Sequence, residues 1–281
     1  MVGGGPVPPD LINRRRAREL LAAHRLSPKR SLGQNFVVDP GTVRRIARLA
    51  GVGPGDRVVE VGAGLGSLTL ALAETGADVT AVEIDRGLAA ILRQVAGPAG
   101  VEVVEADAQS LDWPGLLDDH QWVLVANLPY NIATPLVADL LDTAPQIKRM
   151  LVMVQREVAE RLSAGPGSRA YGAVSVKVAY WATARIVGRV PPQVFLPRPR
   201  VESALVQIER RPRPAVDIEP DALFPLVRTA FGQRRKMLRR SLAGVVTPDH
   251  LAAAGVSPAS RPEDLGVEEW GALARAVAGD G

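Results

Sequence analysis

The sequence contains no cysteine and only three histidines, His24, His120 and His250, which are far apart in the chain. Without cysteine there are neither disulfides nor thiolate metal sites, a composition typical of cytosolic proteins. Three scattered histidines also argue against a zinc centre or a Ser-His-Asp triad. We therefore expect a cytoplasmic protein that holds no metal and whose chemistry uses neither histidine nor cysteine.

Long uncharged apolar runs are also missing, although 47% of the residues are hydrophobic. No stretch reaches the roughly 18 apolar residues that suggest a membrane span. The N-terminus, MVGGGPVPPD, does not have the basic and then apolar pattern of a signal peptide. A chain of 281 residues has room for one large domain with a small appendage. We expect a monomer with no membrane association.

The net charge of +4 hides a strong segregation of charge along the chain. Residues 1–48 sum to +7, residues 49–146 to −11 and residues 147–281 to +8. Thirty of the 34 basic residues are arginine, as a GC-rich genome would produce, but codon usage does not explain the segregation. Basic ends around an acidic centre suggest surfaces that meet a polyanion.

Strands and helices are predicted to alternate through the first two thirds of the chain. A basic amphipathic helix opened by Asp10 is expected over 10–25, and Asp39-Pro40 predicts a second helix through Ala50. The predicted strands are 57–62, 78–84, 101–106, 122–126 and 148–155, and the helices between them are 67–76, 86–96 and 134–142. This alternation predicts an α/β fold with a parallel sheet and right-handed crossovers.

The chain is predicted to end in a small helical domain. A helix from 156, another from about Tyr171 to Trp181, and a closing strand pair, ARIVGRVP and ESALVQIE, complete the larger domain. Residues 220–281 show helical periodicity and no strand pattern. The predicted ranges are a tail and basic helix over 1–25, a main domain over 26–211 and a helical domain over 216–281.

Three successive strand ends carry residues suited to a nucleoside. The first strand ends in a GxGxG turn from Gly62, where backbone can approach a ligand closely. Glu83 ends the second strand and could accept both hydroxyls of a ribose, and Asp107 ends the third and could accept from an adenine amine. Asp85 and Asp107 could instead be helix N-caps. Without a GxGxxG loop or a P-loop, the pattern favours S-adenosylmethionine over NAD or ATP.

The fourth strand runs into ANLPYNIATPL, which can hold a planar base with an exocyclic amine. The side chain of Asn127 and the backbone carbonyls around Leu128 and Pro129 offer acceptors for the two N–H groups, and Tyr130 offers a ring for stacking. Two acceptors favour a pyramidal nitrogen, whose lone pair can attack a methyl group in line. The alternative is a loop that caps the following helix, with Tyr130 half-buried.

Six motifs in order resemble the KsgA/RsmA family of small-subunit rRNA adenine dimethyltransferases, over roughly residues 26–245. They are SLGQNF, VEVGAGLGSLT, AVEID, NLPYNIATPL, VFLPRPRVESALV and FGQRRKMLRRSL. The resemblance implies a Rossmann-like, S-adenosylmethionine-dependent methyltransferase sheet with helices on both faces and a small all-α C-terminal domain. The implied reaction is dimethylation at N6 of two adjacent adenosines in the 3′-terminal hairpin of small-subunit rRNA, a step in ribosome biogenesis.

The resemblance also implies roles for particular residues. Those expected to contact the methyl donor are Asn35, Val37, Gly62, Glu83, Asp107 and Asn127. Those expected to handle the target base are Asn127, Leu128, Pro129 and Tyr130, with Phe195 as a second stacking ring. The partner would be small-subunit rRNA or an assembly intermediate. The chain departs mildly from the family pattern, with GAGLG for GPGLG and Val37 for leucine.

Two basic segments are expected to bind RNA phosphates. They comprise Lys29 and Arg30, and then Arg234, Arg235, Lys236, Arg239 and Arg240. If the second segment were one helix, i,i+4 neighbours would form a continuous basic face. The alternative is a solvated helix face.

Three other functions fit part of this pattern. An antibiotic-resistance methyltransferase of large-subunit rRNA would share the chemistry, but SLGQNF and the QRRK segment favour the small subunit. DNA adenine methyltransferases more often carry a D/N-P-P-Y/F loop, whereas residue 128 is leucine. An rRNA-binding assembly factor without catalysis would not need the set Asn127, Tyr130, Glu83 and Asp107.

Overall fold

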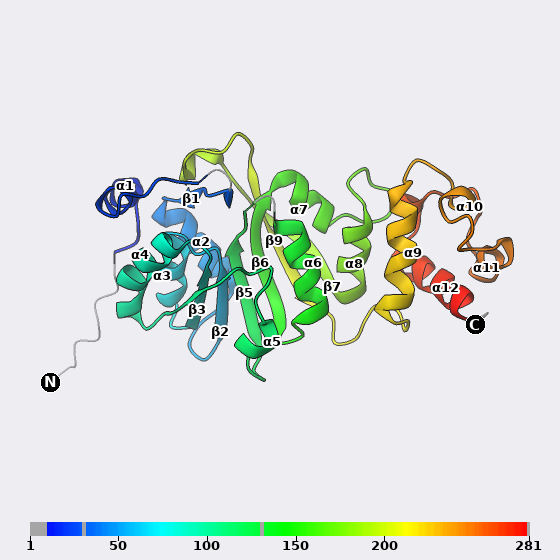
Figure 1. The fold of residues 1–281 in the computed structure, drawn as a ribbon, viewed down its shortest axis with the longest axis horizontal. Helices are drawn as coiled ribbons and strands as arrows, with labels where there is room; N and C mark the ends of the chain where they lie inside the picture. Colours follow the sequence, from blue (N-terminus) through cyan, green and yellow to red (C-terminus); the bar gives the residue numbers. More distant parts are fainter. Residues whose placement is uncertain (1–9, 30–31, 130–131, 280–281) are drawn as a thin grey trace. The chain divides into compact units, whose positions relative to one another are not determined.

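The computed structural model describes residues 10–29, 32–129 and 132–279, and the chain folds into two compact units (Figure 1). We call Met1–Ala159 with Arg185–Ile208 the sheet unit, and Glu160–Ala184 with Glu209–Gly281 the helical unit. Residues 160–184 belong to the helical unit, whereas the sequence-based ranges placed them in the main domain. Among the described residues, no helix is both long and apolar enough to cross a membrane.

The sheet unit begins with an amphipathic helix, α1 (Arg14–Ala23), which buries Ala17, Leu20 and Leu21. Its N-cap is Asn13, whose side chain accepts a hydrogen bond from the backbone N–H of Arg16. The prediction that Asp10 opens this helix is therefore wrong, because the helix begins three residues after Leu11 and is capped by Asn13. Helix α2 (Pro40–Ala50) starts as predicted, with Asp39 as N-cap and Pro40 in the first turn.

A mixed seven-stranded sheet forms the centre of this unit, in the order β4-β3-β2-β5-β6-β9-β7. Its strands are β2 (Arg57–Val61), β3 (Asp78–Glu83), β4 (Glu102–Glu105), β5 (Trp122–Asn127), β6 (Ile147–Gln155), β7 (Ala182–Val190) and β9 (Ser203–Arg210). Strands β4, β3, β2, β5 and β6 run parallel to one another. Because the strand order reverses direction between β2 and β5, their carboxyl ends form the switch point where open α/β sheets bind ligands. The predicted parallel core and closing strand pair are confirmed.

Buried side chains cover both faces of the sheet. Val58, Val123 and Val125 pack in one cluster with residues of α2, α3 (Ser67–Ala73) and α4 (Arg86–Ala96), and Figure 1 shows these helices beside β2 and β3. The side chains of Val59 and Leu124 point to the opposite face of the sheet and are also fully buried. The remaining helices include α5 (Trp113–Leu116), α6 (Ala133–Thr143) and α7 (Arg156–Leu162).

Two very short strands were not expected from the sequence. β1 (Phe36–Val37) and β8 (Phe195–Leu196) form a separate two-stranded antiparallel sheet, in which Val37 is opposite Phe195. Each strand is too short to show an alternating pattern, so only their long-range pairing identifies them. This small sheet lies within the sheet unit, where it takes part in the site described below.

The helical unit has a core of its own, built around Trp270, Leu273 and Phe224. Its helices are α8 (Ala173–Trp181), α9 (Pro220–Gly232), α10 (Leu238–Ser241), α11 (Pro248–Ala253) and α12 (Val267–Ala278). The hydroxyls of Tyr171 and Tyr180 donate to the backbone carbonyls of Leu265 and Ile218, so both buried tyrosines are satisfied. The predicted helical C-terminal region is confirmed.

The basic C-terminal segment is not one helix, so the predicted continuous basic face is wrong. Helix α9 ends at Gly232, and Arg234, Arg235 and Lys236 lie in a turn before α10. The backbone N–H of Lys236 donates to Gln233 O at 2.8 Å, and the N–H of Leu238 donates to Ser260 O at 2.8 Å. These bonds direct the chain away from the helical path, so Arg235 and Arg239 do not stack as i,i+4 neighbours.

Candidate active site

A cavity of about 250 Å³ lies at the carboxyl ends of the central parallel strands in the sheet unit. Its walls come from the ends of β2, β3, β4 and β5 and from the segment around β1. All six residues that we expected to contact a methyl donor line it: Asn35, Val37, Gly62, Glu83, Asp107 and Asn127. Leu128 and Pro129 line it as well. The sites predicted for donor and acceptor therefore share one cavity.

The glycine-rich turn after β2 needs its glycines for close approach. Gly64 has φ +59°, and a Cβ there would lie 2.9 Å from the ring of Phe36. A side chain at Gly64 would therefore be strained and would push β1 away from the cavity. The turn and β1 are packed against each other as one wall of the site.

Glu83 holds this turn in place. Its carboxylate is 5% exposed and accepts hydrogen bonds from the backbone N–H of Gly64 at 2.7 Å and of Asp85 at 2.9 Å. Burial raises the pKa of Glu83, although these backbone donors oppose the change. The carboxylate at the end of β3 thus has a structural role in addition to its predicted contact with a ribose.

Glu60 also lines the cavity, and its side chain is 2% exposed. It is not among the site residues predicted from the sequence. Burial raises its pKa to about 8 against the opposing effect of the Thr69 hydroxyl, and the negative charge of Glu83 contributes in the same direction as burial. Glu60 Oε2 and Ser67 Oγ have no hydrogen-bond partner among the residues that the structure describes. Two buried carboxylates beside one cavity favour a positively charged ligand.

Asp85 is the N-cap of α4, accepting from the N–H groups of Gly87 and Leu88, as the alternative interpretation proposed. It also pairs with Lys29, whose Nζ lies 2.7 Å from Asp85 Oδ2. Burial opposes ionisation of Asp85, but the bonds from Lys29, Leu88 and Gly87 together lower its pKa. Lys29, which we expected to bind RNA, is thus already paired with a carboxylate, and Arg30 lies outside the described residues.

Asp107 lines the cavity and accepts a hydrogen bond from the backbone N–H of Gln109 at 2.9 Å. Beside it, Ile84 lines the same cavity and is 49% exposed, which is unusual for so large an apolar side chain. Ile84 was not predicted from the sequence as a site residue, although its place between Glu83 and Asp85 was a usable signal. An exposed apolar side chain next to carboxylates suits the flat face of a base.

Asn127 ends β5, and its side-chain Nδ2 donates to the backbone carbonyl of Asn35 at 2.9 Å. The N–H of Leu128 donates to Met153 O at 3.1 Å. We had expected a free carbonyl at Pro129, but this oxygen accepts from the N–H groups of Ile132 and Ala133 at the start of α6. Tyr130 lies outside the described residues.

Phe195 does not line the cavity. Its side chain is 1% exposed and belongs to the core cluster of the sheet unit. The structure therefore does not bring this ring to the site, and its role as a second stacking aromatic stays a prediction.

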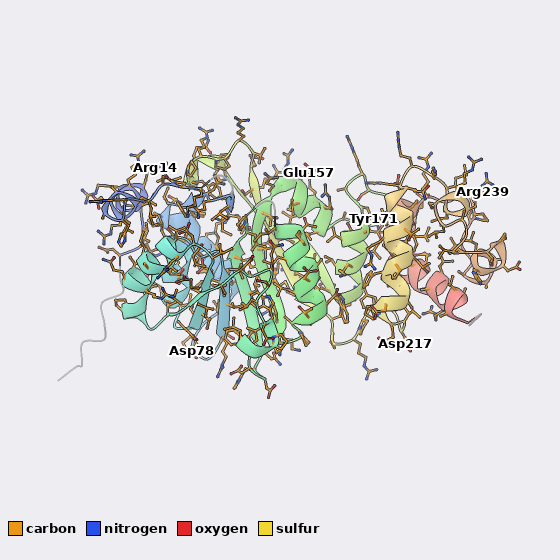
Figure 2. All side chains as sticks on the ribbon, viewed as in Figure 1. Arg14, Asp78, Glu157, Tyr171, Asp217 and Arg239 are labelled. Carbon is orange, nitrogen blue, oxygen red and sulfur yellow. The ribbon has the colours of Figure 1, made fainter. Side chains whose placement is uncertain are left out.

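The helical unit contains a second, strongly basic cavity of about 480 Å³. Arg169, Arg235 and Arg261 line it together with Arg234 and Glu263. Arg234 forms an ion pair with Glu263 at 2.6 Å and donates to Arg169 O at 3.0 Å. Arg235, Lys236, Arg239 and Arg240 are exposed, and Figure 2 labels Arg239.

Comparison with known proteins identifies close relatives of the whole chain. A family model described as ribosomal RNA adenine dimethylase matches residues 25–278. A protein of Bifidobacterium adolescentis named ribosomal RNA small subunit methyltransferase A is 47% identical over 278 residues, which cover 92% of each chain. A protein of the same name from Kineococcus radiotolerans is 49% identical over 276 residues, covering 94% of this chain and 91% of the relative.

Two solved structures resemble the fold. The 23S rRNA methyltransferase ErmE is 28% identical with a TM-score of 0.66, over 86% of this chain and 99% of that one. A dimethyladenosine transferase from Plasmodium falciparum is 24% identical with a TM-score of 0.71, over 84% of this chain and 94% of that one. The second likeness concerns the fold alone.

Proposed function

Because the chain belongs to the ribosomal RNA adenine dimethylase family, we propose that it methylates N6 of two adjacent adenosines in the 3′-terminal hairpin of small-subunit rRNA, using S-adenosylmethionine. The names of relatives that are 47% and 49% identical support the small subunit as substrate. The large-subunit alternative is represented by ErmE at 28% identity and has less support. Such a modification belongs to ribosome biogenesis.

The cavity fits S-adenosylmethionine by charge. When bound, this compound supplies a methyl group on a positively charged sulfonium, and it also carries an ammonium group. Glu60 and Glu83 are buried beside the cavity, and burial raises the pKa of both. A cation next to them would offset the cost of their ionisation. The unsatisfied Glu60 Oε2 would also gain a donor.

Each strand end then has a share in holding the nucleoside. Glu83 would accept from the ribose hydroxyls with lone pairs not used by Gly64 and Asp85. Asp107 would accept from the adenine amine, and Ile84 would cover the adenine face. Asn35, Val37 and Gly62 would complete the walls through backbone and apolar contacts.

The target adenine would be held at the end of β5. Its exocyclic amine has two N–H groups. One would donate a hydrogen bond to the side-chain oxygen of Asn127, and the other would donate to the backbone carbonyl of Leu128. The Pro129 carbonyl is engaged by α6, so it serves to hold the loop. Tyr130 and Phe195 are proposed to stack on the base, which for Phe195 requires its ring to leave the core.

This arrangement accounts for catalysis without a strong base. Two acceptors favour a pyramidal amine and so return the lone pair to nitrogen. The nitrogen would then bond to the methyl carbon of the donor as the carbon–sulfur bond breaks, and the electron pair of that bond would stay on sulfur as a neutral thioether. After attack the nitrogen is positively charged and loses its proton readily to water. Hydrogen-bond acceptors in fixed positions are therefore the main requirement, and the Asn127–Asn35 bond fixes one of them.

The RNA is proposed to lie along exposed basic side chains of the helical unit. Arg235, Lys236, Arg239 and Arg240 are exposed and can neutralise phosphates. Arg234 is paired with Glu263 and Lys29 with Asp85, so we expect these two to support the structure more than to bind RNA.

The observation that carries the proposal is the meeting of Glu83, Asp107 and Asn127, from three strand ends, around one cavity. Purified protein should transfer radiolabelled methyl groups to undermethylated small subunits, with the label recovered as dimethyladenosine. Large subunits and duplex DNA serve as competing substrates. Label found only in either competitor would contradict the proposal, as would donor binding without any transfer.

A further inference from the structure

The N-terminal helix α1 is joined to the segment at β8 by the side chain of Arg14, in addition to the core that it shares with β1 and β8. Arg14, labelled in Figure 2, donates through Nη2 to the backbone carbonyls of Gln193 at 2.6 Å and Phe195 at 3.0 Å. Phe195 is the first residue of β8 and Gln193 lies in the 3-10 turn just before it, about 180 residues further along the chain. Helix α1 precedes the range matched by the family model, which begins at residue 25.

From β8 the contact continues into the wall of the cavity. β8 pairs with β1, and Val38 N–H donates to Val194 O at 2.8 Å. β1 in turn packs Phe36 against the turn at Gly64. A shift of β8 would therefore move β1 as well.

The last link reaches the residue proposed to hold the target amine. The carbonyl of Asn35, just before β1, accepts the hydrogen bond from Asn127 Nδ2 at 2.9 Å. This bond sets the rotation of the Asn127 amide, and so the direction of its oxygen. The connection thus runs from Arg14 through β8 and β1 to Asn127, within the sheet unit.

Helix α1 is a firm support for such a connection. Ala17, Leu20 and Leu21 are buried in the core of the unit, and Asn13 caps the helix. Its C-terminal end is attached by a hydrogen bond of 3.1 Å between His24 Nε2 and Gln94 Oε1. Arg14 is half-buried, whereas Arg18 on the same helix is exposed.

We propose that Arg14 is a positioning residue for methyl transfer: by holding β8 against β1, it fixes the Asn35 carbonyl and therefore the amide of Asn127. The role of Asn127 in this statement rests on the proposed function. Small errors in the position of a catalytic group lower rates strongly, so the effect should appear in the chemical step. RNA affinity should change little.

The test compares Arg14→Ala with Arg18→Ala, which removes the same charge from the same helix. We expect Arg14→Ala to slow single-turnover methyl transfer by about tenfold or more, because it removes two charge-assisted hydrogen bonds, each worth about tenfold or more. The KM for small subunits should stay within about twofold of wild type. Arg14→Lys should restore part of the rate, and Arg18→Ala should behave as wild type.

A double-mutant cycle with Asn127→Ala identifies the route. If Arg14 acts through Asn127, Arg14→Ala should slow the Asn127→Ala protein little further. Fully multiplicative losses, or equal rates for Arg14→Ala and Arg18→Ala, would overturn the inference. If Arg14→Ala does not fold, the methyl-transfer rates of Arg14→Lys and Arg14→Gln are compared with that of Arg18→Ala instead, each with and without Asn127→Ala.

Amide exchange separates this inference from the proposed function. Exchange at the Val38 N–H, which bonds to β8, should become faster in Arg14→Ala and not in Arg18→Ala. If wild-type protein does not methylate small subunits, the proposed function fails, but faster exchange at Val38 would still support the connection from Arg14 to β1. Unchanged exchange at Val38 would refute that connection.

Discussion

Replacing Glu60 by glutamine should remove a pH dependence of donor binding. Burial raises the pKa of Glu60 to about 8 in the free protein. A cationic donor favours the ionised carboxylate, so below pH 8 its binding should release a proton from Glu60. Donor affinity should then rise with pH, by up to about tenfold for each pH unit, and stop rising above about 8. Glu60→Gln has no such proton to release.

The same carboxylate should make the free protein less stable as pH rises. Its pKa in the folded protein lies above the ordinary value of 4.5, so its stabilising contribution is complete below pH 4.5 and is lost as pH rises through about 8. The difference between these two pKa values corresponds to a loss of at most on the order of 5 kcal/mol in the free energy of unfolding. Glu60→Gln should therefore gain stability relative to wild type between pH 5 and pH 8.

Calorimetry in two buffers of different ionisation enthalpy counts the protons released on binding. Titration of the donor's own amino group is common to both proteins and cancels in their difference. Urea unfolding at pH 5 and pH 8 measures the stability change. Equal pH slopes for wild type and Glu60→Gln, in both binding and stability, would refute the assignment of a buried, largely protonated Glu60.

Three further predictions concern binding and catalysis. Glu83→Gln should weaken donor binding roughly tenfold by calorimetry, because one of its backbone bonds and its charge are lost; unchanged binding would exclude the ribose contact. Asn127→Ala should fold normally by circular dichroism and lose about 10²–10³ in single-turnover rate; near-normal turnover would reduce Asn127 to a structural role. The triple change Arg235→Gln, Lys236→Gln and Arg239→Gln should leave donor binding intact. It should lower the slope of log K for binding small subunits, plotted against log salt concentration, by about 2–3. Parallel plots for wild type and the triple variant would mean that the RNA binds elsewhere.

Much of the sheet unit could be predicted from the sequence, because its strands are rich in valine and other β-formers and alternate with helices at regular spacing. Asp39-Pro40 set the start of α2, and the strand ends placed Glu83, Asp107 and Asn127 at one edge. The carboxyl ends of parallel neighbouring strands lie at the same edge of a sheet. The local strand pattern was therefore sufficient to bring these three side chains together.

The features that were not predicted depend on long-range contacts. β1 and β8 have two residues each and exist through their pairing. The turn at Arg235 replaces a helix because Leu238 bonds to Ser260, more than twenty residues away. The pairing of Lys29 with Asp85 likewise has no local signal.

Glu60 was overlooked for a different reason. It lies within a mostly apolar strand, and the strand pattern does not show which way its carboxylate faces. Only the cavity shows that its carboxylate faces a ligand position and is buried without full hydrogen bonding. A charged residue within a buried strand was itself a signal, because such groups are seldom buried unless paired.

The most direct test of the central claim is mass spectrometry of small-subunit rRNA from cells with and without this gene. The proposed function predicts two adjacent N6,N6-dimethyladenosines in the 3′-terminal hairpin of the rRNA when the gene is present. Deletion should leave both adenosines unmodified, and the wild-type gene, but not Asn127→Ala, should restore them. Full dimethylation in the deletion strain, with loss of a methyl group from large-subunit rRNA instead, would contradict it.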